Sequence, residues 1–276
     1  MLMLFKYFEK YGIDNLQAII VNYLTAGTLA IFSANYNGLN TGFSAVLNSN
    51  YFIISIIIGF LFIVTFNLLA YGTQKVGIAV TTVSNKMSMV LPVIMGIYLF
   101  QETFNLIKFS GLLIALIAIY LSAVEKGKLN FNKKYILLIA LIFLGQGIAD
   151  SALNWAQKKV LNNNNLELFF GSVFYMSAGF GLLYFLYKVI KQQNKIQYKS
   201  ILWGFALGVP NYYTLYFFIR SLKSEVFQSS EVFPIVNMGI IILSALGGII
   251  LFREKLSFSN WAGIALAILS IGLISF

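Results

Sequence analysis

Ionisable side chains are rare inside the apolar runs of this sequence, and Lys86 is one of them. It lies about nine residues into the run 77–100, within the polar stretch TTVSNKMS, and Asn85 precedes it. An ammonium group this far from either end of a helix cannot snorkel to the membrane surface and needs a partner. We expect Lys86, with Asn85, to bind an anion or a carboxylate. The alternative is a structural partnership with a carboxylate or with carbonyl oxygens.

Asp150 is the one Asp in an apolar run. Gln146, Asp150 and Asn154 recur every four residues, so they share one face of a helix. Together with neighbouring Trp155, that face could line a substrate cavity or form a hydrogen-bonded seam between helices, and the pattern does not separate these two readings. Asp150 is also the best candidate for coupling to protons or another cation.

Other polar side chains in the runs extend the predicted substrate site. Asn67 with Tyr71, and Tyr212 with Tyr216, are four residues apart and can present hydrogen bonds and ring faces, although Tyr near a helix end is more often an interface anchor. Asn211 follows Pro210, which can kink a helix and free carbonyl groups.

Two polar residues of the run 227–251 complete the predicted site. Glu231 lies about one turn into the run, where it could pair with Lys86 or lie at the mouth of the cavity, and an interfacial position is favoured. Asn237 stands later in the same run. We include both among the substrate-binding candidates.

Catalytic and metal chemistry is disfavoured by composition. The chain has no Cys and no His, which excludes thiolate or imidazole metal sites and His-based catalysis. An intramembrane aspartyl protease needs two facing Asp residues, and only Asp150 lies in an apolar run. We therefore expect no enzyme activity, no catalytic residues, no metal and no cofactor.

The elements that position these residues are predicted to be membrane-spanning helices. The chain is 59% hydrophobic and only 10% charged, and its apolar runs last for whole-helix lengths without the alternation of a β-barrel. An all-α bundle of nine spans follows. The runs are 15–33, 52–71, 77–100, 106–123, 135–157, 166–187, 200–219, 227–251 and 258–276.

The basic residues set the predicted topology. The net charge of +10 lies in short loops between apolar runs, which indicates membrane orientation and not nucleic-acid binding. Of the loop Lys and Arg residues, 13 fall on one side and 5 on the other. The positive-inside rule places the richer side, with the N-terminus, in the cytoplasm and Phe276 outside. We predict a multi-pass protein of the cytoplasmic membrane.

An internal repeat relates the two halves of the chain at an offset of 152 residues. The pairs that match include Glu102 with Glu254, Gly111 with Gly263 and Asn85 with Asn237. Five crossings separate repeat mates, so the two repeats are expected to be inverted, with the binding site between them at mid-bilayer. Glu102 and Glu254 are expected to shape the turns between paired helices.

The repeat predicts the domain organisation. Residues 1–123 form the first repeat, 124–134 a basic linker, and 135–276 a second repeat of five helices. The first repeat has four complete runs, and its opening MLMLF resembles the tail of a further helix. A first helix missing from this chain is favoured over a true nine-span variant.

Small residues predict where helices approach closely. Gly204 and Gly208 form a GxxxG motif, and Gly263 with Ala267 forms a similar small pair. Such pairs allow close contact between helices in membranes.

The duplicated acidic and glycine positions, with the two helical repeats, resemble the drug/metabolite transporter superfamily, in its ten-helix EamA-type branch. The resemblance covers the chain apart from the absent first helix. It implies export or exchange of small metabolites by alternating access without ATP, in agreement with the lack of a Walker A motif. Pro92 lies slightly later and Pro234 several residues earlier than the family pattern, so the helix breaks are expected to differ locally.

Three functional readings follow. The favoured one is a secondary transporter, monomeric or homodimeric, that exports amino acids or other small metabolites, driven by a proton gradient or by the substrate's own gradient. The small-molecule substrate and the lipid bilayer are its expected partners. A flippase for a lipid-linked sugar is the alternative, and a channel or receptor is less favoured because duplication in one chain suggests a complete pathway in one protomer.

Overall fold

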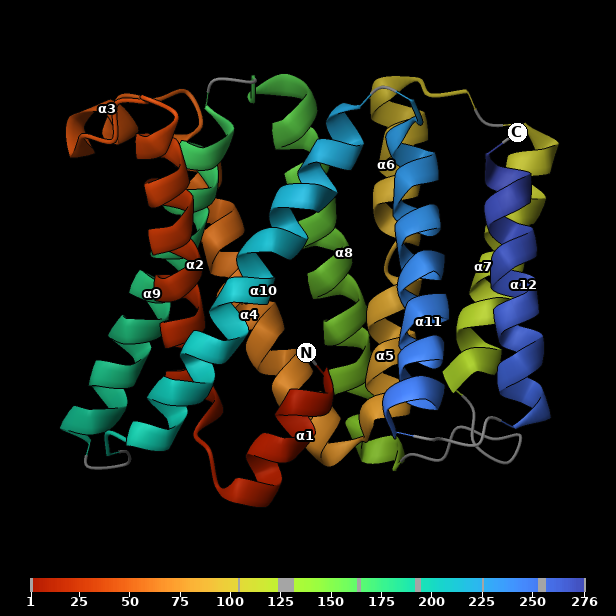
Figure 1. Cartoon of the computed structure of the whole chain (residues 1–276), viewed down its shortest axis with the longest axis horizontal. Helices are drawn as coiled ribbons and strands as arrows, with labels where there is room; N and C mark the ends of the chain where they lie inside the picture. Colours follow the sequence, from red (N-terminus) through yellow and green to blue (C-terminus); the bar gives the residue numbers. More distant parts are fainter. Residues whose placement is uncertain are drawn as a thin grey trace. The chain divides into compact units, whose positions relative to one another are not determined.

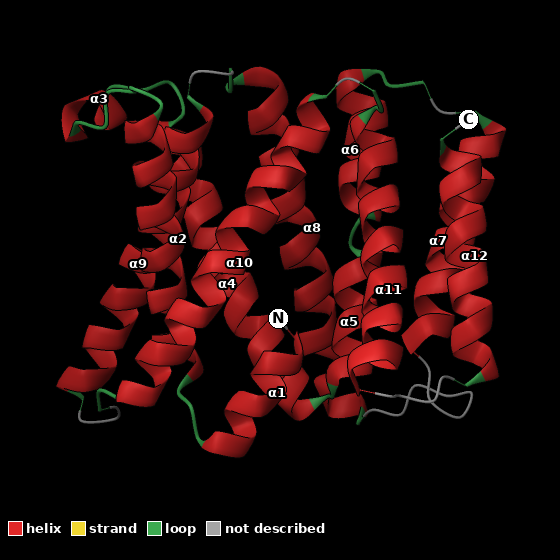
Figure 2. Ribbon diagram, viewed as in Figure 1, coloured by secondary structure: helices red, strands yellow, loops and turns green. Residues whose placement is uncertain are grey.

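The computed structural model describes residues 2–103, 105–123, 132–162, 165–191, 195–224, 226–252 and 257–275. Within these ranges every regular element is a helix and there is no strand (Figures 1 and 2). The predicted all-α class is therefore confirmed for the part of the chain that the structure describes.

Helices occupy all of the predicted apolar runs. Three shorter elements accompany them: α1 (Leu2–Tyr11), α3 (Phe43–Leu47) and a 3₁₀ turn at Lys133–Tyr135. One predicted run, 77–100, is divided into two helices. The long elements are α2 (Asn15–Tyr36), α4 (Phe52–Lys75), α5 (Ile78–Met87), α6 (Val90–Phe100), α7 (Leu106–Ala123), α8 (Ile136–Lys159), α9 (Leu166–Ile190), α10 (Tyr198–Lys223), α11 (Ser229–Phe252) and α12 (Phe258–Ile274).

Among the residues that the structure describes, length and composition identify six helical segments able to cross a membrane. The chain is thus a helical protein with the character of a membrane-embedded bundle. Crossings by α10, α11 and α12, and the identity of the membrane, stay predictions. The six segments are Asn15–Tyr36, Phe52–Lys75, Ile78–Phe100, Leu106–Ala123, Lys133–Lys159 and Leu166–Ile190.

The chain folds into two compact units. The first unit comprises Met1–Gln74 and Ala152–Lys223, and the second comprises Lys75–Ser151 and Ser224–Phe276. Each unit draws helices from both predicted repeats, so this division differs from the division of the sequence into halves. The helix α8 contributes its first part to the second unit and its last part to the first.

In the first compact unit, α2 packs against both α9 and α10. A Cβ atom added to Gly204 would lie 2.7 Å from the Ala18 carbonyl oxygen, and one added to Gly208 would lie 2.8 Å from that of Asn22. These distances are too short for any side chain, so the predicted role of the GxxxG motif in close packing is confirmed. The two contacts run in the same order along both helices, which makes α2 and α10 parallel neighbours.

Aromatic rings fill the rest of the core of the first unit. Phe5 and Phe8 of α1 are almost fully buried, with Phe5 edge-to-face on Phe66 of α4 and Phe8 on Trp203 of α10. Tyr23 of α2 donates its hydroxyl hydrogen to the Phe62 carbonyl at 3.0 Å. The short helix α1 is therefore held by apolar side chains on one of its faces.

In the second compact unit, the repeat mates α7 and α12 pack side by side. A Cβ on Gly263 would lie 2.6 Å from the Ser122 nitrogen, and a Cβ on Gly111 would lie 2.7 Å from Ile274 Cγ1. The two helices are therefore antiparallel, and each contributes a glycine to the contact. The predicted close packing at Gly263 is confirmed, and Ser270 adds a hydrogen bond to the Gly111 carbonyl at 2.9 Å.

Candidate functional site

The centre of the candidate site is an interruption in the span Ile78–Phe100. The helix α5 ends at Met87 and α6 begins at Val90. Pro92 has no N–H group to donate to the Ser88 carbonyl, which instead accepts from the Leu91 N–H at 3.0 Å, one residue closer than in an α-helix. The Ser88 hydroxyl donates to the Asn85 carbonyl at 2.5 Å. The single helix predicted over 77–100 is therefore broken next to its polar stretch.

Lys86 lies at the end of α5, directly before this break. Its ammonium group donates a hydrogen bond to Oδ1 of Asn237 on α11 at 2.9 Å, and the side chain is half-buried. An amide oxygen is a neutral acceptor, so this bond orients the ammonium group without cancelling its charge. Asn237 is the repeat mate of Asn85, the residue before Lys86.

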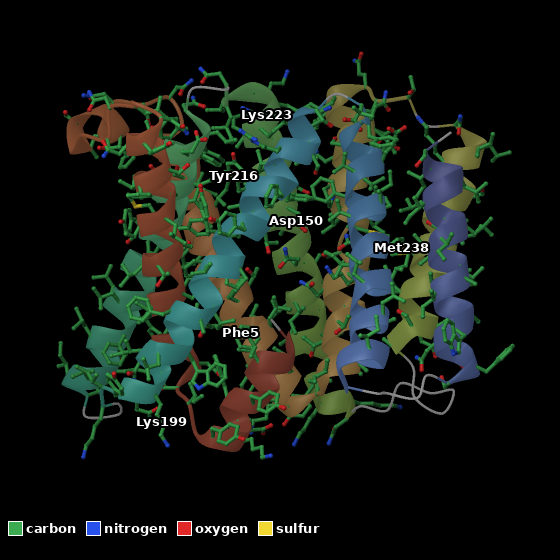
Figure 3. The ribbon with its side chains drawn as sticks, in the orientation of Figure 1. Phe5, Asp150, Lys199, Tyr216, Lys223 and Met238 are labelled. Atoms are coloured by element: carbon green, nitrogen blue, oxygen red, sulfur yellow. The ribbon has the colours of Figure 1, made fainter. Side chains whose placement is uncertain are left out.

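Asp150 supplies the opposite charge from α8, where Figure 3 labels it. Gln146 donates from Nε2 to Oδ1 of Asp150 at 2.9 Å, which confirms that these residues share a helical face. The charges of Asp150 and Lys86 interact. Within the described ranges, however, Nζ of Lys86 does not lie within 4.0 Å of a carboxylate oxygen of Asp150.

The helix α8 packs closely against the break between α5 and α6 at Gly147. A Cβ atom on Gly147 would lie 2.9 Å from the Ser88 carbonyl and would overlap the Leu91 side chain. Ser84 of α5 adds a hydrogen bond to the Ile139 carbonyl of α8 at 2.7 Å. We name Lys86, Asn237, Asp150 and Gln146 the Lys86 cluster. It is built where α5, α8 and α11 of the second compact unit converge.

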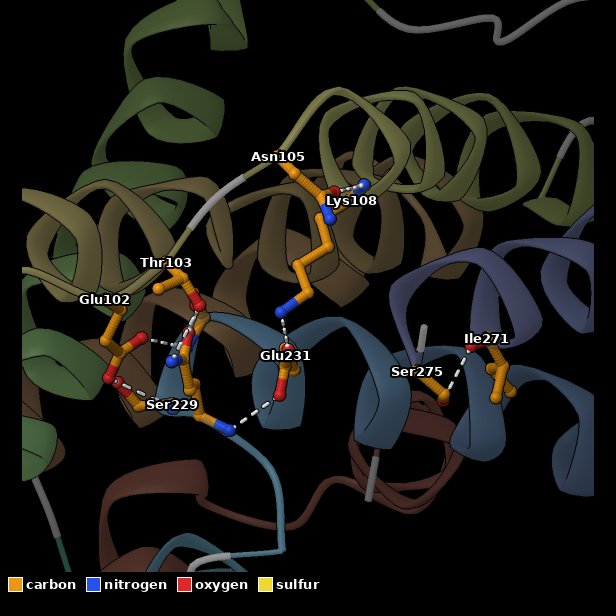
Figure 4. A network of polar contacts seen from close by, with 10 residues as sticks. Glu102, Thr103, Asn105, Lys108, Ser229, Glu231, Ile271 and Ser275 are labelled. Atoms are coloured by element: carbon orange, nitrogen blue, oxygen red, sulfur yellow. Dashed lines mark hydrogen bonds and ion pairs between the residues drawn. The ribbon is translucent and has the colours of Figure 1, made fainter.

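Glu231 belongs to a different contact from Lys86. Figure 4 shows it in an ion pair with Lys108 of α7, and its other carboxylate oxygen accepts from the Gln228 N–H at 2.7 Å. Since Glu231 lies in the first turn of α11, these contacts fix the beginning of that helix. Of the two expectations for Glu231, the pairing with Lys86 is not found.

Glu102 is the second acid at the start of α11. It accepts from the Ser229 N–H at 3.2 Å, the Ser229 hydroxyl at 2.6 Å and the Ser230 N–H at 2.8 Å (Figure 4). The backbone N–H of Glu102 donates to the Gly96 carbonyl at 3.3 Å in the turn after α6. Its carboxylate also satisfies N-terminal amides of α11, which is a partner that the sequence did not predict. Its repeat mate Glu254 lies outside the described residues.

Six predicted site residues belong to the first compact unit. Asn67 donates to the Ile63 carbonyl of its own helix at 2.7 Å, and Tyr71 is exposed. Asn154 is fully buried near the end of α8, and Trp155 beside it is partly exposed. Asn211 and Tyr212 of α10 are buried, and the Tyr212 ring lies 5.8 Å from that of Tyr216.

The Lys86 cluster can bind a small polar molecule by charge and hydrogen bonds. Lys86 offers donors to a carboxylate or phosphate, Asp150 offers acceptors to a cation or a proton, and the two amides fix their orientation. Across the described ranges no three acidic, Cys or His side chains gather as a metal site would require. Sequence reasoning missed Asn22 of α2, which is fully buried and had no amide or charged residue three or four positions away to mark it.

Comparisons with known proteins support the fold. No family model matches the chain. An uncharacterized protein of Haemophilus influenzae is 27% identical over 273 residues, covering 98% of this chain and 91% of that protein. A solved crystal structure superposes with a TM-score of 0.74 over 99% of this chain and 92% of its own, at 14% sequence identity. The similarity to that structure establishes the arrangement of helices alone.

Proposed function

We propose that this protein is a secondary transporter that carries small metabolites, such as amino acids, across the cytoplasmic membrane by alternating access, in the direction of export. The observation that carries the proposal is the Lys86 cluster, in which a lysine held by Asn237 lies next to a break in an apolar helical segment. Ionisable groups and broken helices within membrane spans are both costly, and transporters combine them at their substrate sites.

The roles of the residues follow from their contacts. The Lys86 ammonium group binds the carboxylate of the substrate, and Asn237 holds it in place. Asp150 couples transport to the proton gradient by taking up and releasing a proton, while Gln146 orients its carboxylate. Because Lys86 and Asp150 attract each other without direct pairing, a bound molecule can compete for either charge.

Packing of repeat mates supports the inverted architecture that this function needs. The mates α7 and α12 are antiparallel neighbours. Adding 152 to the residue numbers of α2 gives nearly the range of α9, so these two helices are also repeat mates. They pack side by side, with Gly27 against Tyr175 and Gly171 against Ile31. Antiparallel mates are expected if two repeats are related by a pseudo-two-fold axis in the membrane plane. This agrees with membership of the drug/metabolite transporter superfamily, which we include in the proposal.

Reconstitution into proteoliposomes tests the proposal. We would measure uptake and counterflow across a panel of amino acids and related metabolites for the parent chain, Lys86→Ala and Lys199→Ala. Lys199 is an exposed lysine at the start of α10 (Figure 3), so its variant is the matched control. We expect saturable transport of one carboxylate-bearing class, lost in Lys86→Ala and kept in Lys199→Ala.

Two results would contradict the proposal. Equal transport by the parent and Lys86→Ala would leave the cluster a structural role only. No transport of the panel, with scrambling of a fluorescent lipid-linked sugar in the same vesicles, would favour the flippase reading.

A further inference from the structure

Asn22 is a buried amide that the first compact unit leaves without a partner. It is 0% exposed in the middle of α2, and neither its Oδ1 nor its Nδ2 has a hydrogen-bond partner in the described part of the chain. Leaving such a group unsatisfied costs the full desolvation penalty of the amide, so buried amides almost always have a hydrogen-bond partner. Asn22 takes no part in the Lys86 cluster.

Asn211 on α10 is the second residue with an unsatisfied amide group. It is 8% exposed, and its Nδ2 has no partner among the described residues. Gly204 and Gly208 mark the face of α10 that contacts α2, and Asn211 continues that face at helical spacing. A Cβ at Gly208 would lie 2.8 Å from the Asn22 carbonyl, so Asn22 and Asn211 stand about one helical turn apart along the same contact.

The neighbouring polar groups are already used. The Thr25 hydroxyl donates to the Val21 carbonyl at 2.8 Å, and the Tyr23 hydroxyl donates to the Phe62 carbonyl at 3.0 Å. Gly208 adds no side chain to the contact where it meets the Asn22 carbonyl. The two amides therefore share one short stretch of the contact, where both polar atoms of the Asn22 amide and Nδ2 of Asn211 lack partners among the described residues.

The chemistry of this stretch selects an uncharged ligand. Residues 15–36 of α2 and 200–219 of α10 contain no Asp, Glu, Lys or Arg. An ion buried beside Asn22 would find no compensating charge in these two segments, and burying an uncompensated charge costs far more than an unmade hydrogen bond. An oxygen-bearing neutral group fits, because Asn22 offers one acceptor and one donor and Asn211 offers a donor.

We propose that Asn22 and Asn211 form a second binding site, between α2 and α10, for a small neutral hydrogen-bonding group that bridges the two amides. Two sources can supply the group: a resident water molecule, or a hydroxyl or carbonyl group of a polar solute. A water that makes about three hydrogen bonds to buried polar groups is a common structural component of proteins.

The sign of a stability change tests this site. We would compare the melting temperatures of the parent, Asn22→Leu, Asn211→Leu and the double variant in lipid nanodiscs, without added solute and then with glycerol or neutral amino-acid amides. Leu has the same branched arrangement of four side-chain heavy atoms as Asn but makes no hydrogen bond. Asn67→Leu is the control, because the Asn67 side chain bonds only its own helix.

A resident water predicts that Asn22→Leu lowers the melting temperature by about 3–6 °C without solute. It also predicts that the double variant loses less than the two single changes combined, since both amides bind one ligand. A solute group predicts little change without solute, but a stabilisation of the parent by solute that Asn22→Leu loses.

The proposal is overturned if Asn22→Leu raises the melting temperature and leaves any effect of solute unchanged, because the amide would then be unsatisfied and its removal favourable. If Asn22→Leu does not elute as a folded protein, Asn22→Thr and Asn211→Leu carry the same comparison with the same expected signs.

Discussion

The two compact units differ in the polar groups that they bury. In the second unit, Lys86 and Asp150 are ionisable, and each has an amide neighbour in hydrogen-bond contact, Asn237 and Gln146. In the first unit, Asn22 and Asn211 are neutral, and amide atoms of both lack partners among the described residues. Charges in an apolar bundle need partners supplied by the fold, whereas neutral amides can rely on a small bound molecule. The first arrangement favours binding of an ion, and the second favours binding of a neutral group.

Removing the negative charge of the Lys86 cluster gives the largest expected effect. Asp150→Asn preserves the shape of the side chain and a hydrogen bond with Gln146 but cannot take up a proton. We expect proton-driven accumulation of substrate to fall at least about 10-fold while exchange continues, since a coupling group of this kind is worth about 1.4 kcal/mol or more. Parallel assays of accumulation and counterflow measure the two activities. Equal losses of both would assign Asp150 to substrate binding or to helix packing.

Removing Asn237, the partner of Lys86, tests whether their hydrogen bond stabilises the ammonium group. Asn237→Leu leaves the ammonium group without the acceptor seen at 2.9 Å, and we expect a loss of about 1–3 kcal/mol of stability. Adding Lys86→Met to Asn237→Leu removes the stranded charge, so the double variant should recover much of the loss. Chemical denaturation in mixed micelles checks both. A double variant as unstable as Asn237→Leu would contradict this account of the bond.

Glycine contacts exist in both units, and α12 offers a matched pair for testing one of them. Gly263→Ala places a methyl group 2.6 Å from the Ser122 nitrogen of α7, which overpacks the contact at a cost of about 1–3 kcal/mol. Gly272 of the same helix has no atom within 4 Å of an added Cβ. Gly272→Ala should therefore be neutral or stabilising by up to about 1 kcal/mol. Equal changes of melting temperature in both variants would show that the close contact at Gly263 does not decide the effect.

Removing the Glu102 carboxylate, which binds amides in the first turn of α11, is expected to have a smaller effect on stability. Glu102→Ala leaves the amides of Ser229 and Ser230 without their acceptor, and we expect a loss of about 1–2 kcal/mol. Thr103→Ala removes an exposed hydrogen bond with Gln228 next to it and should cost less than about 0.5 kcal/mol. Thermal denaturation of the two variants measures the difference, and equal losses would argue against capping by Glu102.

The sequence allowed the helices to be predicted well because apolar runs and loop charges act locally. The runs coincide with helices to within a few residues at most ends, and the glycines at 204, 208 and 263 were expected at close contacts. The break after Met87 was expected only as a local rearrangement, since it depends on which carbonyls Pro92 leaves without a donor.

The tertiary partners of the polar residues were harder to predict. Glu231 pairs with Lys108 and not with Lys86, and the Glu102 carboxylate binds the start of α11; neither partner was predicted from the sequence. Lys86 and Asp150 were found because charges inside apolar runs stand out. Asn22 was missed because a single neutral amide within an apolar helix carries no periodic signal. Contacts between residues more than 100 positions apart are set by packing that no local pattern contains.

Substrate counterflow in proteoliposomes tests the central claim most directly, with the parent, Lys86→Ala and Lys199→Ala reconstituted at equal protein content. Our account predicts saturable exchange of a carboxylate-bearing metabolite by the parent and by Lys199→Ala, with a decrease of about 10- to 100-fold in Lys86→Ala, as expected when a charge-assisted hydrogen bond to the substrate is lost. Undiminished exchange by folded Lys86→Ala would contradict it.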